Sequence, residues 1–479
     1  MATKRLSLFA TTFNLNGSLP SLEDVRIWLQ GQCNDVTKEV GEHHQRSLRC
    51  SASDADLVII SLQESPVAAG TRPMLSTSGA DSEGIKPVSF SAGMSDPSNN
   101  TSSTENNDGE AEFLDNIQYV LSEEHDLVAD ISMGAKQSTL REESGGVKWY
   151  GYLRLLVYAR GSDFVTELRQ TSIGIAIAVG AKAMSRSNEI LFNNSSLEHT
   201  QYHALGSPDK GGVCLVMPTL KIVAVCAHLA GTNKYEVAER IFDRIRHKQL
   251  HIISRVLENA IQNIGYGDES IDDWRKIIAG DLNFRVEVYD KEEYKGRRGK
   301  DWRAVADIVQ SGGQRDSRCH QQRVAELFCC HDRLVQYLEK GPMHLWASHN
   351  EDEENDQMLA FPNLLHSMVD LVHYKCFLGA DTSGRSDPHI VMPTFSFQTE
   401  SDASAIIGSD GNVCKASGKL ASSRRPYSDK RTPSWPDRIL MSRELVENDE
   451  NDSSIVVVGS CPSIILSDHC PVWSFTICS

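Results

Sequence analysis

Short runs of apolar residues, separated by polar segments, are the clearest pattern in this chain. The runs are rich in valine, isoleucine and leucine, and their shortness is typical of strands buried on one or both faces. Near the end of the chain, Trp473, Phe475 and Ile477 alternate with Ser474 and Thr476, as in a half-buried strand. The apolar runs span residues 6–13, 56–62, 153–159, 173–179 and 220–227.

One longer stretch, 236–261, has the periodicity of an amphipathic helix. Residues 361–374 predict a second, added amphipathic helix. Strands that alternate with long helices indicate a layered α/β protein. The apolar positions that share one face of the first helix are Val237, Ile241, Ile245, Ile252 and Val256.

Four stretches do not fit this pattern, and we interpret them as insertions. Residues 67–112 are dominated by Ser, Gly, Asp, Asn and Thr, and we expect them to be disordered because they bury too little apolar surface to offset the entropy of ordering. Essential polar residues occur as far apart as Asn14 and His469. We therefore predict a single catalytic domain over 1–479. The other insertions are 181–205, 351–387 and 399–425.

Composition narrows the possible functions. The formal net charge of −17 opposes binding to nucleic acid, so no nucleic-acid partner is expected. No apolar run approaches the roughly 20 residues that span a bilayer. The 12 cysteines lack Cys-x-x-Cys spacing and suit reduced thiols in the cytosol. We expect a cytoplasmic protein, with transient contact at a membrane surface as an open alternative.

Three loops, at 280–285, 433–438 and 467–470, carry the acids that a metal-assisted attack of water on a phosphoester requires. Asp281 and Asn283 are two residues apart, so at a strand end they point the same way. Glu64 ends an apolar run, where an anionic side chain is costly unless a cation meets it, and Mg²⁺ prefers such oxygen ligands. His469 follows Asp468 directly and needs a carboxylate on its other nitrogen to fix its tautomer.

These motifs, with their order along the chain, resemble the inositol polyphosphate 5-phosphatases of the endonuclease/exonuclease/phosphatase superfamily. The pair at 280–285 (Gly-Asp-Leu-Asn-Phe-Arg) and 431–438 (Arg-Thr-Pro-Ser-Trp-Pro-Asp-Arg) is the most specific part of the resemblance. The resemblance runs from about residue 6 to 475 and implies a DNase I-like fold, a four-layer sandwich of two packed, mostly antiparallel sheets flanked by helices. The remaining motifs lie at 11–17, 62–64, 210–213, 228–230 and 467–470.

The resemblance also implies a reaction and a role for each residue. It implies Mg²⁺-dependent hydrolysis of the 5-phosphate of phosphatidylinositol polyphosphates, such as the 4,5-bisphosphate, or of soluble inositol polyphosphates. For Arg438, we favour bracing of Asp437 over contact with substrate. The implied catalytic residues are Asp281, Asn283, His469, Asp437 and His228, the metal ligands are Glu64, Asn14 and Asp468, and the substrate-binding residues are Asn16, Lys210, Arg285, Arg431 and Arg438.

Some positions depart from the family pattern. Asp209 stands where the family has Asn, and Pro436 replaces its usual Cys or Thr. In the segment that grips the 4-phosphate in the family, this chain has Phe395 and Ser396, and a lysine four residues before the Pro-Ser-Trp motif is replaced by Asp429. We therefore predict weak preference for a 4-phosphate. A nuclease or other phosphodiesterase, and a non-catalytic phosphoinositide-binding scaffold, are the alternatives.

Overall fold

The structure, a computed structural model, contains two mixed β-sheets. The first sheet has six strands in the order β12 (Ile455–Ser460), β13 (Val472–Cys478), β1 (Leu6–Asn14), β2 (Leu57–Ser65), β4 (Tyr152–Arg160) and β3 (His125–Met133). The structure describes residues 5–30, 50–66, 104–134, 152–180, 200–204, 210–231, 239–264, 269–286, 318–341, 361–371, 393–395, 434–446, 455–461, 464 and 466–478.

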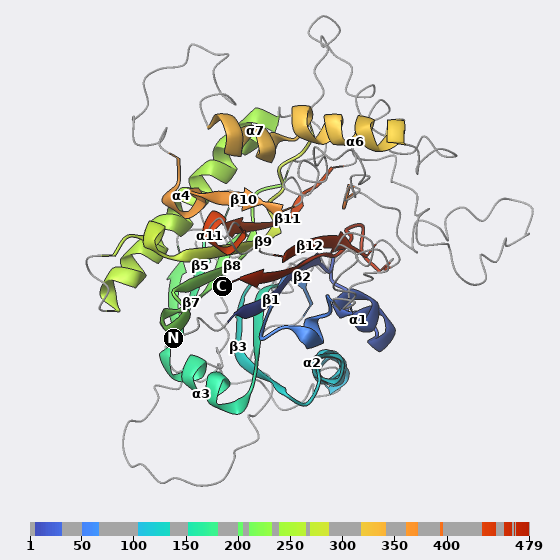
Figure 1. The fold of residues 1–479 in the computed structure, drawn as a ribbon, viewed down its shortest axis with the longest axis vertical. Helices are drawn as coiled ribbons and strands as arrows, with labels where there is room; N and C mark the ends of the chain where they lie inside the picture. The colour runs from blue at the N-terminus through green and yellow to red at the C-terminus, as the bar shows by residue number, and fades with distance from the viewer. Residues whose placement is uncertain are drawn as a thin grey trace, which may run out of the picture.

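The second sheet packs against the first (Figure 1). Its seven strands follow the order β10 (Met368–Asp370), β11 (Asp437–Ser442), β9 (Arg275–Asp281), β8 (Ile222–His228), β7 (Gly211–Met217), β5 (Ile173–Ala178) and β6 (Thr200–Ala204). Neighbouring strands are antiparallel except in the pairs β1 with β2, β8 with β9, and β5 with β6. Both sheets are therefore mostly antiparallel, as predicted.

Alternation along the strands produces separate apolar layers. In β8, Ile222, Ala224 and Cys226 face the core between the sheets, whereas Val223 and Val225 face the outer side of the second sheet. This period of two follows from strand geometry.

Helices α4 (Glu239–Asn263) and α7 (Arg333–Lys340) contribute apolar side chains to that outer layer. Helices α1 (Leu22–Leu29) and α2 (Thr104–Leu121) cover the other side of the first sheet. The predicted four-layer sandwich is confirmed.

Shorter elements complete the described chain. Helix α3 (Ser162–Thr171) contacts β3 and β4, and α6 (Arg318–His331) precedes α7. Helix α11 (Arg443–Val446) follows β11. The 3₁₀-helices are η2 (Ala52–Asp54), η4 (Pro218–Leu220), η5 (Ile271–Asp273) and η7 (Asn363–Leu365).

The predicted helix at 361–374 is wrong. Residues 363–365 form the 3₁₀-helix η7, and residues 368–370 form β10, which pairs with β11 at the edge of the second sheet. The carbonyl of Pro362 accepts a hydrogen bond from the Leu365 amide and closes a tight turn. Pairing with a distant strand thus outweighs the local helical pattern.

Parts of the predicted insertions are ordered elements. Helix α2 begins at Thr104, inside the stretch 67–112, and β6 lies inside 181–205. The apolar face of α2, which includes Phe113 and Ile117, packs against the outer face of the first sheet. Of the predicted insertions, residues 67–103, 181–199, 205, 351–360, 372–387 and 399–425 lie outside the described residues.

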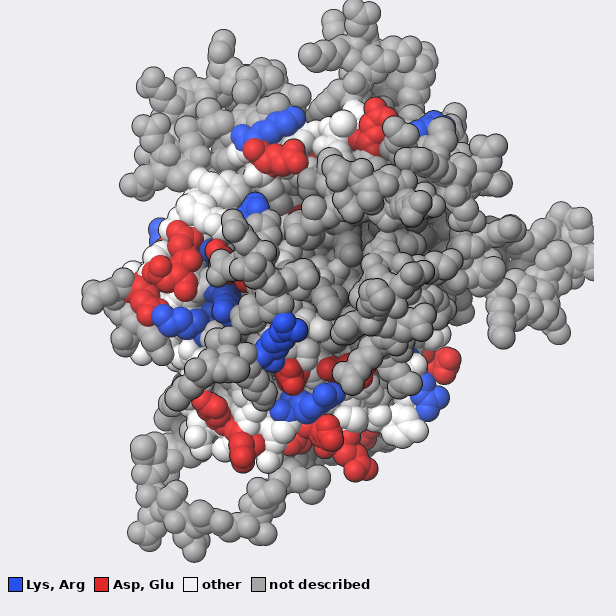
Figure 2. All heavy atoms as spheres, in the orientation of Figure 1, with Lys and Arg blue, Asp and Glu red and all other residues white. Residues whose placement is uncertain are grey.

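The described surface is mixed in charge. On the face shown in Figure 2, acidic and basic side chains of the described residues are interspersed. A continuous basic face, the usual footprint of nucleic-acid binding, is not seen among those side chains on that face. Among the helices of the described chain, none is long and apolar enough to cross a bilayer.

Candidate active site

The candidate site lies where the parallel strands of the two sheets end. Asn14 is the last residue of β1, and Glu64 is next to the last of β2. His228 ends β8, and Asp281 ends β9. Because both pairs are parallel and central in their sheets, four carboxyl-terminal strand ends converge on one region.

Strand register aligns four motifs in one row across the second sheet. Gly211 pairs with His228, His228 pairs with Asp281, and Asp281 pairs with Asp437. Gly280 allows this close alignment, since a Cβ atom there would collide with the Ala227 carbonyl. The row brings together residues that are more than two hundred positions apart in sequence.

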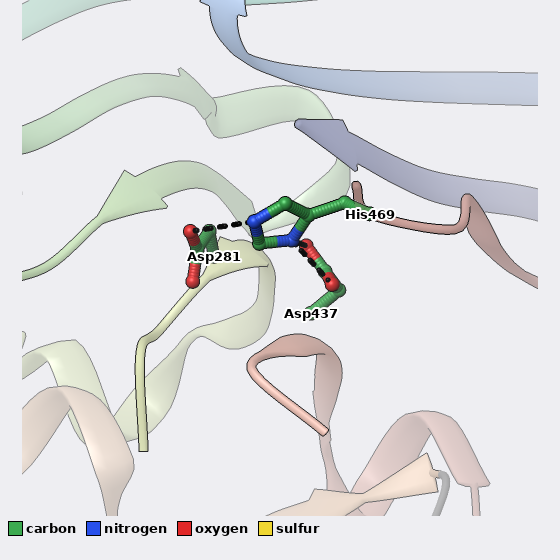
Figure 3. Close-up of side chains that lie close together, drawn as sticks. All are labelled: Asp281, Asp437 and His469. Carbon is green, nitrogen blue, oxygen red and sulfur yellow. Dashed lines mark hydrogen bonds and ion pairs between the residues drawn. The ribbon is translucent and has the colours of Figure 1, made fainter. Parts of the chain in front are cut away.

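His469 lies between two aspartates (Figure 3). Its Nδ1 is 2.9 Å from Asp437 Oδ2 and 3.1 Å from Oδ1, and its Nε2 is 3.9 Å from Asp281 Oδ2. All three side chains are buried, and their ligand-type atoms lie within 4.8 Å of one another. The Asp437–His469 pair expected from the sequence is present, with the second imidazole nitrogen turned towards Asp281.

The positive charge of His469 and the negative charges of Asp437 and Asp281 stabilise one another. Burial opposes the positive charge of His469, but Asp437, Asp281 and Asp468 outweigh it and raise the pKa of His469 to about 9. For Asp281, burial acts to raise the pKa, but His469, His228 and Arg285 outweigh it and hold the pKa below its usual range. At neutral pH the site therefore combines an imidazolium with a carboxylate.

The predicted metal ligands surround this group. Glu64 Oε1 lies 3.8 Å from His228 Nε2, and Asp468 Oδ1 lies 4.0 Å from His469 Nε2. Asn14 donates from Nδ2 to Asp281 Oδ2 at 3.2 Å and accepts from the Asn16 amide at 3.0 Å. The side chains of Glu64 and Asp468 are 38% and 26% exposed, so their oxygens can be reached from solvent.

Hydrogen-bond donors and positive charge also lie close to Asp281. His228 Nε2 is 3.6 Å from Asp281 Oδ2, and Lys210 Nζ lies 3.3 Å from His228 Nδ1. Burial and the neighbouring Lys210 lower the pKa of His228 well below its usual value, so His228 is neutral at pH 7. Arg285 donates to Asn283 Oδ1 at 2.5 Å, and the Asn283 side chain donates to the Leu229 carbonyl at 3.0 Å.

Three site residues have left-handed backbone conformations. The φ angles of Asn16, Glu64 and Asn283 are 48°, 50° and 58°. Asparagine tolerates this region, but glutamate adopts it rarely. Such residues persist where the surrounding structure holds them, and they cluster at functional sites.

Arg438, which we expected to brace Asp437 or to contact substrate, is fully buried and binds other groups instead. Its buried guanidinium donates to Asp370 Oδ2 at 2.5 Å, pairs with Asp332, and donates to the Trp435 carbonyl. Asp332 also caps α7 through the amides of residues 334 and 335. Burial raises the pKa of Asp332 to about 7 in spite of Arg438. Arg431, a predicted substrate-binding residue, lies outside the described residues.

Three residues that lie in the motifs predicted from the sequence have contacts in the site that the sequence did not assign to them. Ser467 donates to the Asn14 carbonyl at 2.7 Å and accepts from the His469 amide at 3.1 Å, which links two motifs. Thr394 donates to Asp437, and Phe395 contacts His469. The Ser-Asp-His motif contains Ser467, but no sequence signal connects Thr394 with Asp437.

Comparisons with known proteins show only weak likenesses. No protein-family model matches the chain, and no curated protein matches it significantly. Among solved structures, the inositol polyphosphate 5-phosphatase domain of Spsynaptojanin, in complex with inositol (1,4)-bisphosphate and calcium, has a TM-score of 0.46 and 13% identity over 99% of this chain and 84% of that chain.

Two further structures have lower scores. The Cimex nitrophorin ferrous NO complex has a TM-score of 0.42 and 12% identity, covering 99% of each chain. An endonuclease/exonuclease/phosphatase from Beutenbergia cavernae has a TM-score of 0.37 and 13% identity over 98% of this chain and 72% of that chain. Since these scores are low, the function proposed below is based on the side chains and motifs of this chain.

Proposed function

We propose that this protein is a divalent-metal-dependent hydrolase of phosphoesters and, more specifically, a phosphomonoesterase that removes the 5-phosphate of inositol polyphosphates. The observation that carries the proposal is the buried group formed by Asp437, His469 and Asp281. It joins three distant motifs in the geometry that general acid–base chemistry on a phosphate needs, with side-chain nitrogens and oxygens 2.9 to 3.9 Å apart.

The proposed reaction assigns a different task to each residue of this group. Asp281, an anion held at a strand end, orients the attacking water and accepts its proton. The bond from water oxygen to phosphorus forms as the bond from phosphorus to the inositol oxygen breaks, the inositol oxygen takes up a proton from solvent and leaves as a hydroxyl, and Asp281 returns its proton to solvent. His469, kept positive by Asp437, stabilises the charge that develops on the phosphate oxygens.

The carboxylate and amide oxygens near the group suit a hard divalent cation, and the described side chains whose ligand atoms converge within 4.8 Å are those of Asp281, Asp437 and His469. Glu64, Asp468 and the amide of Asn14 would hold Mg²⁺, since the carboxylates are partly exposed and oxygen ligands suit this ion. When bound, the ion supplies charge neutralisation at the phosphoester. Glu64 is the central candidate because its backbone is held in a conformation that glutamate rarely adopts.

The cationic side chains near Asp281 suit an anionic substrate. Lys210 and Arg285 supply cationic donors, while Asn283 supplies an amide between Arg285 and the Leu229 carbonyl. Asn16, beside Asn14, and Arg431 remain proposed substrate contacts. The specific choice of a 5-phosphate on inositol is supported by the motifs at 280–285 and 431–438. Phosphoinositide lipids and soluble inositol phosphates share this chemistry.

Phosphate release from a panel of substrates tests the proposal. The panel contains soluble inositol phosphates, short-chain phosphoinositides and bis(p-nitrophenyl) phosphate, each with Mg²⁺, and for the diester the release of p-nitrophenol is measured in place of phosphate. We expect release from 5-phosphorylated inositols and none after Asp281→Asn. Cleavage of the diester alone would indicate a phosphodiesterase. No turnover of any compound by the folded protein, together with binding of phosphoinositides, would indicate a non-catalytic scaffold.

A further inference from the structure

Residues 393–395 form a short bridge between two active-site loops. The Thr394 and Phe395 amides donate to the Ser434 carbonyl at 3.0 and 3.2 Å, and the Ser434 amide donates back to Phe395 at 2.8 Å. The Cys470 amide donates to the Thr394 carbonyl at 2.8 Å. The segment therefore lies between the loop that precedes Asp437 and the loop that carries His469.

Thr394 contacts the carboxylate that holds His469. Its hydroxyl donates to Asp437 Oδ2 at 2.8 Å, and the same oxygen accepts from His469 Nδ1 at 2.9 Å. Thr394 and Asp437 are buried. A carboxylate with two donors on one oxygen has its orientation fixed, so the imidazole it binds is fixed as well.

Phe395 contacts two of the cationic side chains. Its ring centroid is 4.0 Å from Arg285 Cζ and 4.5 Å from the centroid of the His469 ring. Cations favour the face of an aromatic ring, and a guanidinium at this distance is held by cation–π attraction and by packing. Phe395 is only 1% exposed, so its ring supports these side chains and is not open to a substrate.

We propose that Thr394 and Phe395 are positioning residues for the reaction, an inference that rests on the proposed function. Thr394 fixes Asp437, and through it the direction of His469 Nε2 towards Asp281. Phe395 fixes the separation of the His469 imidazole from the Arg285 guanidinium. Two groups that must meet the same phosphate are thus placed by neighbouring residues on one segment.

Matched variants separate positioning from packing. Thr394→Val removes the hydroxyl at nearly constant volume, and Thr394→Ser restores it. Phe395→Met keeps the volume without the ring, and Phe395→Tyr restores the ring. Thr476→Val and Phe9→Met are the controls, because Thr476 also donates a buried hydrogen bond, to Met441 Sδ at 3.7 Å, and Phe9 also stacks on an aromatic ring, at 6.1 Å.

The expected results differ between the two residues. Thr394→Val should lower kcat on the order of 10- to 100-fold with little change in KM, since small misplacements of catalytic groups have effects of this size. Phe395→Met should lower kcat and also raise KM, because Arg285 binds substrate. The conservative variants should recover most of the activity. The controls should lower the melting temperature but keep kcat.

A double-mutant cycle gives the decisive comparison. In an Asp437→Asn background, Thr394→Val should have little further effect on kcat, because its target is already lost. Equal fold-losses in both backgrounds, or losses in the two controls as large as in the variants, would overturn the proposal even if the wild-type protein is a 5-phosphatase.

A readout independent of turnover covers the case in which the proposed function fails. In protein with ¹⁵N-labelled histidine, the His469 Nδ1 proton should give a downfield resonance in the wild type and in both controls, assigned by its loss in His469→Ala. It should be broadened or lost in Thr394→Val and Phe395→Met. An unchanged resonance in both variants would refute the positioning role, whatever the substrate panel shows.

Discussion

Replacement of Asp437 by asparagine tests the central pair of the site. The carboxylate is fully buried and receives two donors, His469 Nδ1 at 2.9 Å and the Thr394 hydroxyl at 2.8 Å. Asparagine has nearly the same shape but only one oxygen. Both donors meet Oδ2 in the wild type, so an NH₂ group at that position would face both donors without accepting from either and would favour an unprotonated Nδ1, which is the wrong tautomer of His469.

The size of the effect follows from these contacts. A hydrogen bond to a buried charged group contributes roughly 1.5–3 kcal/mol, which corresponds to about a 10- to 100-fold change in rate. Loss of the correct tautomer adds to this, and the same exchange in a serine-protease triad lowers kcat by about 10⁴-fold. We expect Asp437→Asn to lower kcat between about 10²- and 10⁴-fold and to change KM little.

Single-turnover phosphate release under saturating Mg²⁺ measures this change. Asp130→Asn is the matched control, because Asp130 is also a buried carboxylate in a tight ion pair, with Arg154 at 2.7 Å. It should reduce stability without reducing kcat. Adding Asp437→Asn to His469→Ala should have little further effect. If the two losses multiply instead, Asp437 does not act through His469 and our reasoning is wrong.

Four other measurements follow from the structure. Turnover should be abolished by excess EDTA and restored by Mg²⁺, and release that persists in EDTA would exclude the metal role. Glu64→Gln should raise the Mg²⁺ concentration for half-maximal activity at least about tenfold, which a metal titration measures. Burial raises the pKa of Asp332 from 3.8 to about 7, so between these pH values the folded state binds a proton that the unfolded state has lost. The free energy of unfolding should therefore fall as the pH rises from about 4 to 7. Asp332→Asn should flatten this slope in denaturant titrations. Kinetic comparison of 5-phosphorylated substrates should show weak preference for a 4-phosphate, and a preference of several orders of magnitude would contradict the interpretation of Ser396 and Asp429.

The sequence predicted the main strands because their apolar runs are short and local. The runs at 153–159 and 220–227 correspond closely to β4 and β8, and the helix at 236–261 corresponds to α4. The stretch 361–374 misled the prediction because its apolar spacing fits a helix. The strand β10 that forms there depends on pairing with β11, which local periodicity cannot reveal.

The composition of the site was predictable from motifs, but its geometry was not. Asp281 and His469 were identified by the residues beside them in sequence. That His228, Asp281 and Asp437 share one register position is a property of strand pairing. The contacts of Thr394 and Phe395 depend on a segment with no periodicity, so only the folded arrangement shows them.

The pairing of β1 with β13 makes folding of the site a late event in synthesis. Leu6 pairs with Cys478, and the Thr11 hydroxyl bonds to the Val472 carbonyl across 461 positions. Until β13 leaves the ribosome, one edge of β1 has no partner and the His469 loop is missing. Such a nascent chain exposes an apolar strand edge, which is prone to aggregation. Ribosome-bound chains truncated before β13 should therefore depend on chaperones, and the candidate site should form only when β13 is available to pair with β1.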